Sequence, residues 1–223
     1  MKPKITIAID GPAASGKSTT ARILAEKLNY IYIDTGAMYR AATLAILDGN
    51  VDIHDMEKVS AFVKELKIEL KSGNHTLLND KDVTHLIRSP RINEVISIIS
   101  TYPNVRNKMV ELQRSMAAQG GVVMDGRDIG TIVLPNADLK VFLVASIKQR
   151  AKRRLKELKQ SDQEISYEAV EQEITNRDKL DSSRTTSPLK KAADARELDT
   201  SNLSIEDQVQ IIEEWVKKII NSK

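Results

Sequence analysis

The residues best suited to chemistry lie in a glycine-rich segment near the amino terminus, GPAASGKST. The segment has the spacing of Gly, four residues, Gly, Lys and Ser or Thr, and it lies between an apolar run and a helical stretch. Gly11 and Gly16 let the backbone curl so that amide N–H groups point inward, and the following helix adds its positive end. Lys17 would then reach the β- and γ-phosphates of a nucleotide, and the Ser18 hydroxyl would ligate Mg²⁺. An ordinary glycine-rich turn is the alternative, which the flanking strand and helix disfavour.

Two more polar segments follow predicted strands. The segment DTGAMYR contains Asp34 and Arg40, and GVVMDGRDIGT contains Asp125, Arg127 and Asp128. The carboxyl ends of parallel strands form the edge at which open α/β sheets bind ligands. We therefore expect Arg40 to reach a second anionic ligand, Asp125 to hold Mg²⁺, and Arg127 and Asp128 to face the site. For Asp34 and Asp125 the alternative is a carboxylate that caps a helix or a turn.

A third cluster, NRDKLDSSR, places Arg177, Asp181 and Arg184 on one face while the segment stays helical. An exposed ladder of ion pairs is the plainer interpretation. An anionic ligand is favoured because several arginines are expected in loops near strand ends, and Arg binds phosphate with two hydrogen bonds. These arginines are Arg40, Arg106, Arg127, Arg177 and Arg184.

These side chains need a scaffold, and short apolar runs predict one. Strands are expected over Ile5–Asp10, Gly121–Gly126 and Leu139–Ser146, with weaker candidates at Tyr30–Asp34 and Ala195–Ser201. Strands that alternate with helices indicate an α/β fold whose parallel sheet is covered on both faces.

The remaining segments suggest a helical frame with an insert. A final helix is predicted from Ser204 and Asp207, which have capping-box spacing, and a basic helix from Ser146 to Lys159. The basic helix presents either a solvated face or an anion-binding one. Between residues 52 and 100, a helix over His54–Leu66 and turn residues predict a small antiparallel insert, and Ser182–Ala195 is expected to be a loop.

Composition excludes several classes of protein. The 223 residues include 34 Lys and Arg against 31 Asp and Glu, a net charge of +3, which does not suit a chain that coats nucleic acid or membranes. There is no Cys and there are only three widely spaced His, which argues against disulfides, thiolate chemistry and zinc. No apolar run suits a signal peptide or a membrane span of about 20 residues, so we expect a cytoplasmic protein.

The order of the motifs resembles that of bacterial cytidylate kinases, in the nucleoside monophosphate kinase family. The motifs are GPAASGKST, DTGAMYRAA, SIISTYPNVRNKMVELQR, MDGRDIGT and RDKLDSSRTTSPLKKAADA, and they span nearly the whole chain. The resemblance implies a P-loop nucleoside monophosphate kinase core in a single catalytic domain, 1–223. It also implies a CMP-binding region with an antiparallel insert at 36–104 and a helical lid at 148–185.

The resemblance also assigns roles to individual residues. ATP would bind to Gly11, Pro12, Ala13, Ala14, Ser15, Gly16, Lys17, Ser18 and Thr19. Arg40, Arg127 and Arg184 would hold the acceptor phosphate, Ser97, Arg106 and Asp128 the cytosine ring, and Arg177 and Asp181 the sugar. Ser18, Asp34 and Asp125 would support Mg²⁺, and the catalytic cations would be Lys17, Arg127, Arg184, Arg150 and Arg154.

The implied activity is transfer of the γ-phosphate of ATP to CMP or dCMP by a monomer, with neither nucleic acid nor membrane as a partner. A carboxylate suits the N4 amino donor of cytosine, whereas uracil would turn an oxygen toward Asp128. The alternatives are another P-loop small-molecule kinase, acting on UMP, dTMP, AMP or shikimate, and a nucleotide-dependent RNA-binding ATPase. The latter is disfavoured because the basic helix lacks aromatic residues for base stacking.

Overall fold

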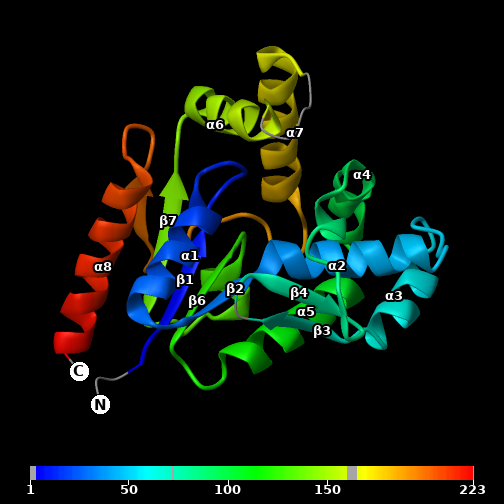
Figure 1. The fold of residues 1–223 in the computed structure, drawn as a ribbon, viewed down its shortest axis with the longest axis horizontal. Helices are drawn as coiled ribbons and strands as arrows, with labels where there is room; N and C mark the ends of the chain where they lie inside the picture. The colour runs from blue at the N-terminus through cyan, green and yellow to red at the C-terminus, as the bar shows by residue number, and fades with distance from the viewer. Residues whose placement is uncertain (1–3, 72, 160–164, 223) are drawn as a thin grey trace. The chain divides into compact units, whose positions relative to one another are not determined.

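The computed structural model describes residues 4–71, 73–159 and 165–222 (Figure 1). The chain divides into two compact units. One unit combines residues 1–30 with 120–223, and the other consists of residues 31–119.

A parallel sheet forms the centre of the first unit. Its strand β1 (Thr6–Asp10) pairs on one side with β6 (Val122–Gly126) and on the other with β7 (Leu139–Val144), which pairs in turn with β8 (Arg196–Asp199). With β2 (Ile31–Asp34), the sheet has five strands in the order β2-β6-β1-β7-β8. The predicted parallel α/β sheet is confirmed, including its two weaker strands.

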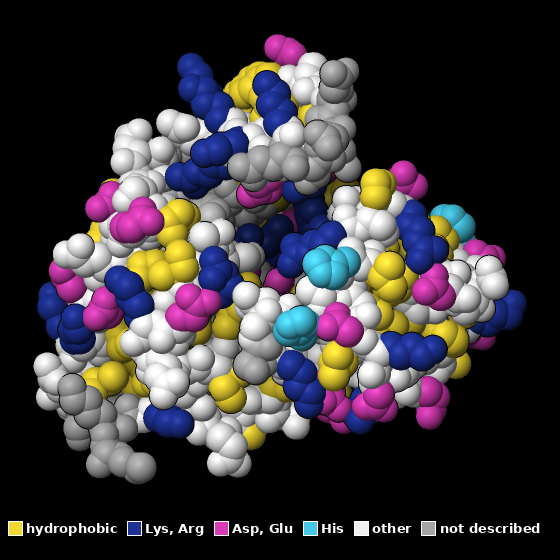
Figure 2. Space-filling model, in the orientation of Figure 1, with side chains coloured by type: hydrophobic (Ala, Val, Ile, Leu, Met, Phe, Trp, Pro, Cys, Tyr) yellow, Lys and Arg dark blue, Asp and Glu magenta, His cyan; other side chains and the backbone are white. Residues whose placement is uncertain are grey.

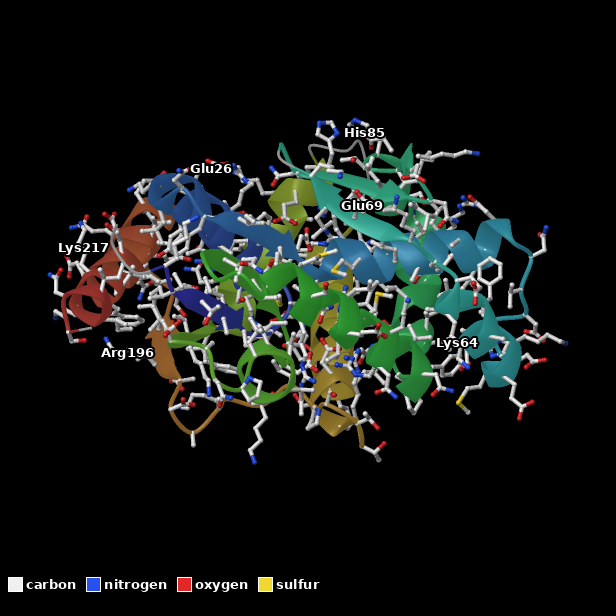
Figure 3. All side chains as sticks on the ribbon, turned by 90° about the horizontal axis from the view of Figure 1, so that it is seen from below. Glu26, Lys64, Glu69, His85, Arg196 and Lys217 are labelled. Carbon is white, nitrogen blue, oxygen red and sulfur yellow. The ribbon has the colours of Figure 1, made fainter. Side chains whose placement is uncertain are left out.

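Helices α1 (Lys17–Leu28) and α8 (Ile205–Asn221) pack against each other and against this sheet. The predicted capping box is present, since the side chains of Ser204 and Asp207 each accept from the other residue's backbone N–H. The inner face of α8 buries Val209, Ile212 and Val216, whereas Glu26 of α1 and Lys217 of α8 are exposed (Figure 3). The apolar spacing therefore marks the buried stripe of this helix.

Two helices come after β7, and a tight turn comes after β6. Helices α6 (Ile147–Lys159) and α7 (Tyr167–Ser183) pack against each other (Figure 1). They share a small apolar core, Ala151, Leu158, Val170 and Ile174. Residues 160–164 of the expected lid lie outside the described residues. The loop predicted from Ser182 begins two residues later, because α7 continues to Ser183. The π-helical turn η2 (Ile129–Val133) comes shortly after β6.

The second unit contains the predicted antiparallel insert. Its strands are β3 (Ile68–Lys71), β4 (His75–Leu78) and β5 (Lys81–Asp82), with β4 in the middle. The helical elements are α2 (Thr35–Asp48), α3 (Met56–Lys64), η1 (Leu86–Arg88), α4 (Pro90–Ile99) and α5 (Pro103–Ala117). In Figure 3, Lys64 marks the end of α3 and Glu69 lies in β3. The helix predicted from His54 begins later because Asp55 caps it, its carboxylate accepting from the N–H of Lys58.

Candidate active site

The glycine-rich loop lies where the sequence pattern predicts it, between β1 and α1. At Gly11, a Cβ atom would collide with the backbone oxygen of Leu143, and Gly16 has a φ of 92°, in the region that favours glycine. Gly16 is also the N-cap of α1, so Lys17, Ser18 and Thr19 form the first turn of that helix. The loop therefore places its last three residues at the positive end of α1.

Lys17, the first residue of α1 after Gly16, is buried, with 6% of its surface exposed. Its Nζ donates to the backbone oxygen of Pro12 at 2.9 Å, across the loop. Burial, and after it the positive charge of Arg127, lower the pKa of Lys17 to about 7, although the carboxylate of Asp125 opposes the shift. Arg177 adds a third positive charge nearby. The site thus gathers cations at a point where a polyanion would stabilise them.

Ser18 and Asp125 form a pair of oxygen ligands. The Ser18 hydroxyl donates to Asp125 Oδ2 at 2.7 Å, and Asp125 is buried in β6 one residue from its carboxyl end. Hydroxyl and carboxylate oxygens suit Mg²⁺, which usually takes one or two protein carboxylates together with substrate phosphates. Within the described residues, no group of three or more His, Cys, Asp or Glu is arranged to hold a metal.

Asp34, the third residue expected to support magnesium, belongs to the second unit. Its carboxylate caps α2 by accepting from the Ala37 N–H at 2.9 Å, and it pairs with Arg88 at 3.4 Å. The capping alternative therefore holds for Asp34. A role toward magnesium stays a prediction for this residue.

The third motif forms a buried ion-pair cluster. Asp181, 3% exposed, bonds through Oδ2 to Arg127 Nε at 2.8 Å and through Oδ1 to Arg184 Nη2 at 2.6 Å. Burial raises the pKa of Asp181, but the charges of Arg127 and Arg184 outweigh it and hold that pKa below its ordinary value. Burial and Arg127 both lower the pKa of the neighbouring Arg177. These residues are not the exposed ladder of the plainer interpretation.

Helices α6 and α7 attach to the phosphate loop through Arg150 and Asp178. Arg150 is buried and donates to the backbone oxygens of Ala13 at 3.2 Å and Ala145 at 3.0 Å. It also pairs with Asp178, whose other oxygen accepts from the Ala13 N–H at 3.3 Å. The two helices therefore hydrogen-bond to both the N–H and the backbone oxygen of Ala13 in the loop.

The rest of the basic helix divides into two kinds of residue. Arg153 donates to the backbone oxygen of Ser15 at 3.2 Å and to Thr200 Oγ1 at 3.1 Å, whereas Arg154 pairs with Glu157 on its own helix at 3.3 Å. The exposed surface of α6 consists largely of basic side chains (Figure 2), namely Lys148, Lys152, Lys156 and Lys159. One side of this helix is solvated, as the plainer interpretation has it, and the other contacts the phosphate loop; anion binding by the helix stays a prediction.

Sequence reasoning missed three residues of this region: Asp10, Arg153 and Asp178. Asp10 is 4% exposed and accepts from the N–H groups of Ile129 at 2.8 Å and Gly130 at 2.7 Å. A usable signal existed for Asp10, since it is the acidic end of the apolar run ITIAID. Nothing in the sequence separates Arg153 from its basic neighbours, or Asp178 from the adjacent charges.

The second unit holds the other predicted acceptor residues on packed helices. Arg40, on α2, donates to Asn93 Oδ1 at 2.7 Å and to the backbone oxygen of Ile87 at 3.3 Å. Arg106, on α5, is buried, donates to the Ser100 oxygen at 3.3 Å and lies 5.7 Å from the ring centroid of Tyr39. Ser97 is partly buried on α4, and both α4 and α5 pack against α2.

The expectation that the site arginines lie in loops is wrong for three of them. Arg40, Arg106 and Arg177 are in helices α2, α5 and α7. Helical positions suit them because the helix backbone and its packed neighbours hold long side chains in fixed directions. Arg127 follows β6, and Arg184 follows α7, as non-helical residues.

The parallel sheet, the glycine-rich loop after β1 and the buried cations beside it define a P-loop phosphate-binding protein. Comparison with known proteins gives the family: the cytidylate kinase family model matches residues 7–219. A cytidylate kinase of Bacillus subtilis strain 168 is 52% identical over 221 residues, covering 98% of this chain and 99% of that protein. The cytidylate kinase of Bacillus thuringiensis strain Al Hakam is 52% identical over 215 residues, with coverages of 95% and 96%. The chain belongs to the cytidylate kinase family.

A solved structure supports the fold independently. An uncharacterized protein from Eubacterium ventriosum superposes with a TM-score of 0.52 over 97% of this chain and 99% of that chain, at 14% identity. Likeness at this level of identity concerns the fold alone. Among the described residues, no helix has the length and apolar character needed to cross a bilayer.

Proposed function

We propose that this protein transfers the γ-phosphate of ATP to CMP or dCMP, giving ADP and CDP or dCDP. The observation that carries the proposal is the gathering of Lys17, Arg127 and Arg177 beside a phosphate loop. Two multiply charged anions must meet for phosphoryl transfer, and preorganised cations reduce their repulsion. We infer CMP as the acceptor substrate because both relatives are named cytidylate kinases.

The chemistry requires little beyond charge and alignment. The attacking atom is an oxygen of the acceptor phosphate, whose second pKa is about 6, so the group is largely dianionic at neutral pH. A general base is therefore unnecessary, which agrees with a site rich in Arg, Lys and Asp. Lys17 would bind the β- and γ-phosphates, and Arg127 and Arg184 would hold the acceptor phosphate in line with them.

Magnesium is the proposed cofactor, bound together with ATP. Ser18 and Asp125 would hold the ion, with Asp34 as a further support, and the nucleotide phosphates would complete its coordination. When bound, the ion supplies positive charge against the β- and γ-phosphate oxygens. The hydrogen bond between Ser18 and Asp125 supports this assignment because it keeps two oxygen ligands together.

The acceptor nucleotide would be held by residues from several elements. Arg40 joins Arg127 and Arg184 at its phosphate, and Arg177 and Asp181 bind the sugar hydroxyls. Ser97, Arg106 and Asp128 read the base, since cytosine offers one amino donor and two acceptors. Rigid side chains favour such recognition, and the contacts of Arg40 and Arg106 restrict both guanidinium groups.

We further propose that the working protein is a cytoplasmic monomer whose partners are ATP and CMP or dCMP. Its small net charge of +3 supports small-molecule rather than nucleic-acid partners. Acceptors such as UMP, dTMP, AMP or shikimate are the enzymatic alternatives to CMP.

An ADP-coupled assay with ATP, Mg²⁺ and each acceptor in turn tests the proposal. We expect CMP and dCMP to be phosphorylated at least about tenfold more efficiently than UMP, because uracil leaves two acceptors facing each other at a cost of about 1–3 kcal/mol. Preference for any other acceptor would contradict the proposal.

The variant Asp128→Asn tests the base assignment. An amide donor in place of the carboxylate should lower the ratio of CMP to UMP efficiency by about tenfold or more. The control is Asp138→Asn, which alters a carboxylate bonded to Thr6 in the same unit. Unchanged CMP turnover and selectivity in Asp128→Asn would remove Asp128 from the base site.

A further inference from the structure

Asp10 is a buried carboxylate that the mechanism above leaves without a role. It is the last residue of β1 and directly precedes Gly11, the first residue of the phosphate loop. Its two carboxylate oxygens accept separate hydrogen bonds, from the N–H of Ile129 at 2.8 Å and of Gly130 at 2.7 Å. Both donors are the first residues of η2, and they lie 119 and 120 residues after Asp10 in the chain.

A charge at this position is unfavourable for stability alone. The pKa of Asp10 is raised to about 6, because burial outweighs the two backbone N–H groups, which lower it. The nearby charges of Asp128 and Lys17 raise and lower this pKa, respectively. At neutral pH the group is ionised in a strand whose preceding residues, Ile7 to Ile9, are completely buried. An apolar or neutral residue would avoid the cost of burying this charge, so its presence needs another reason.

The turn that Asp10 holds begins at the acceptor-binding residues. Arg127 and Asp128 link the end of β6 to η2. The backbone oxygen of Asp128 accepts from the N–H groups of Ile132 at 2.9 Å and Val133 at 3.2 Å. Asp10 bonds the two residues directly after Asp128, so the backbone of Asp128 is anchored both by the turn itself and by β1.

We propose that Asp10 is a positioning residue: by bonding Ile129 and Gly130, it holds Arg127 and Asp128 in the direction that the acceptor nucleotide requires. Because Asp10 is next to Gly11, it also ties the position of the acceptor-binding turn to that of the phosphate loop. The inference rests on the proposed function, in which Arg127 binds the acceptor phosphate and Asp128 the base.

The test compares Asp10→Asn with the control Asp138→Asn, whose carboxylate also accepts a backbone N–H, from Thr6 at 2.7 Å, at the opposite end of β1. Asn keeps one acceptor but presents a donor to the second N–H, so the turn loses one anchor. We expect the KM for CMP to rise at least about tenfold in Asp10→Asn and the KM for ATP to change less than about threefold. Both values should stay near those of the wild type in Asp138→Asn.

The pH dependence separates positioning from a general loss of structure. As the pH falls through about 6, the carboxyl becomes protonated and then resembles Asn, so the ratio of wild-type to Asp10→Asn efficiency with CMP should fall toward one. The charged groups around Asp10 are Lys17 of α1, Asp128 before η2 and Lys140 of β7, whose amine bonds Asp194. Titration of the acceptor phosphate is common to both proteins and cancels in the ratio.

Several outcomes would overturn the inference: equal rises in both KM values, a loss confined to kcat, or a ratio that does not vary with pH. If the wild type prefers another acceptor, the proposed function is wrong, and the same comparison with that acceptor still tests Asp10. Thermal unfolding checks that each variant is folded. If Asp10→Asn is not, the smaller and neutral Asp10→Ser replaces it, with the same expected rise in KM.

Discussion

At the scale of single residues, the site contains charged side chains that are buried away from solvent. Lys17, Asp181 and Asp10 are each less than a tenth exposed, and each has an altered pKa with an identified cause. Asp181 is compensated by two arginines, whereas at Lys17 burial and the charges of Arg127 and Arg177 outweigh the carboxylates of Asp125 and Asp181. A bound anion would offset this excess of positive charge, so we expect the cluster to serve binding rather than folding.

The lowered pKa of Lys17 predicts that ATP binding is accompanied by proton uptake. Because its pKa is lowered to about 7, most of the amine is neutral at pH 8, and a triphosphate should restore its charge. ATP binding at pH 8 should therefore take up close to one proton, and ATP affinity should fall as the pH rises from about 7 to 9. Calorimetry in two buffers with different ionisation enthalpies measures the uptake.

The matched control for this measurement is Lys17→Arg, which stays charged in both states because the guanidinium does not titrate in this range. Its binding enthalpy should not depend on the buffer through residue 17. Equal proton uptake by the wild type and Lys17→Arg would show that the protons go elsewhere.

At the scale of elements, the helices α6 and α7 contact the phosphate loop through a few local groups. Their shared core consists of Ala151, Leu158, Val170 and Ile174, and Ala14 of the loop packs against it. The polar links join Arg150 and Asp178 to Ala13, and Arg153 to Ser15. We expect a helix pair with its own small core and so few attachments to open more readily than the central sheet. This arrangement suits the predicted lid.

Replacing Asp178 with Ala should loosen that attachment. The Ala13 N–H loses its acceptor and Arg150 loses its ionic partner, so we expect the Ala13 amide to exchange with solvent about tenfold faster, equivalent to about 1 kcal/mol. Hydrogen exchange on the nucleotide-free protein measures this. Glu173→Ala, at an exposed carboxylate on the same helix, is the control. Unchanged exchange at Ala13 would mean that other contacts hold the loop.

At the scale of the whole molecule, the proposed reaction requires water to be excluded and nucleotides to be admitted. A permanently closed site would not admit ATP, and trapped water would hydrolyse it, so parts of the chain must move. We propose that the acceptor region (36–104) and the lid (148–185) close on the substrates. The hydrogen bonds of Arg150 and Asp178 to Ala13 are few and polar, which is consistent with such motion of the lid.

Small-angle X-ray scattering tests closure and assembly together. A compact chain of 223 residues has a radius of gyration of roughly 17 Å, and we expect a decrease of roughly 1 Å when CMP and a non-hydrolysable ATP analogue are both bound. Each nucleotide alone should give a smaller change. The forward scattering should correspond to a monomer of 24.9 kDa. No compaction with both ligands would argue strongly against the moving regions.

The features that could be predicted from sequence depend on residues close together in the chain. The phosphate loop, the capping box at Ser204 and Asp207, and the apolar strands follow from backbone conformations and side-chain periods that neighbouring residues dictate. The family resemblance extended this list to the residues expected to bind each substrate, although it gave no contacts between them.

Tertiary structure decided which distant groups meet and how deeply they are buried. Ser18 and Asp125 are 107 residues apart, Arg127 and Asp181 are 54 apart, and Asp10 and Ile129 are 119 apart. Each pair forms because the parallel strand order brings separate segments to the same region, and neither spacing nor composition encodes that order directly. Removal from water, which alters the pKa values of Lys17 and Asp10, depends on the packing of the whole unit and so cannot be deduced from local sequence.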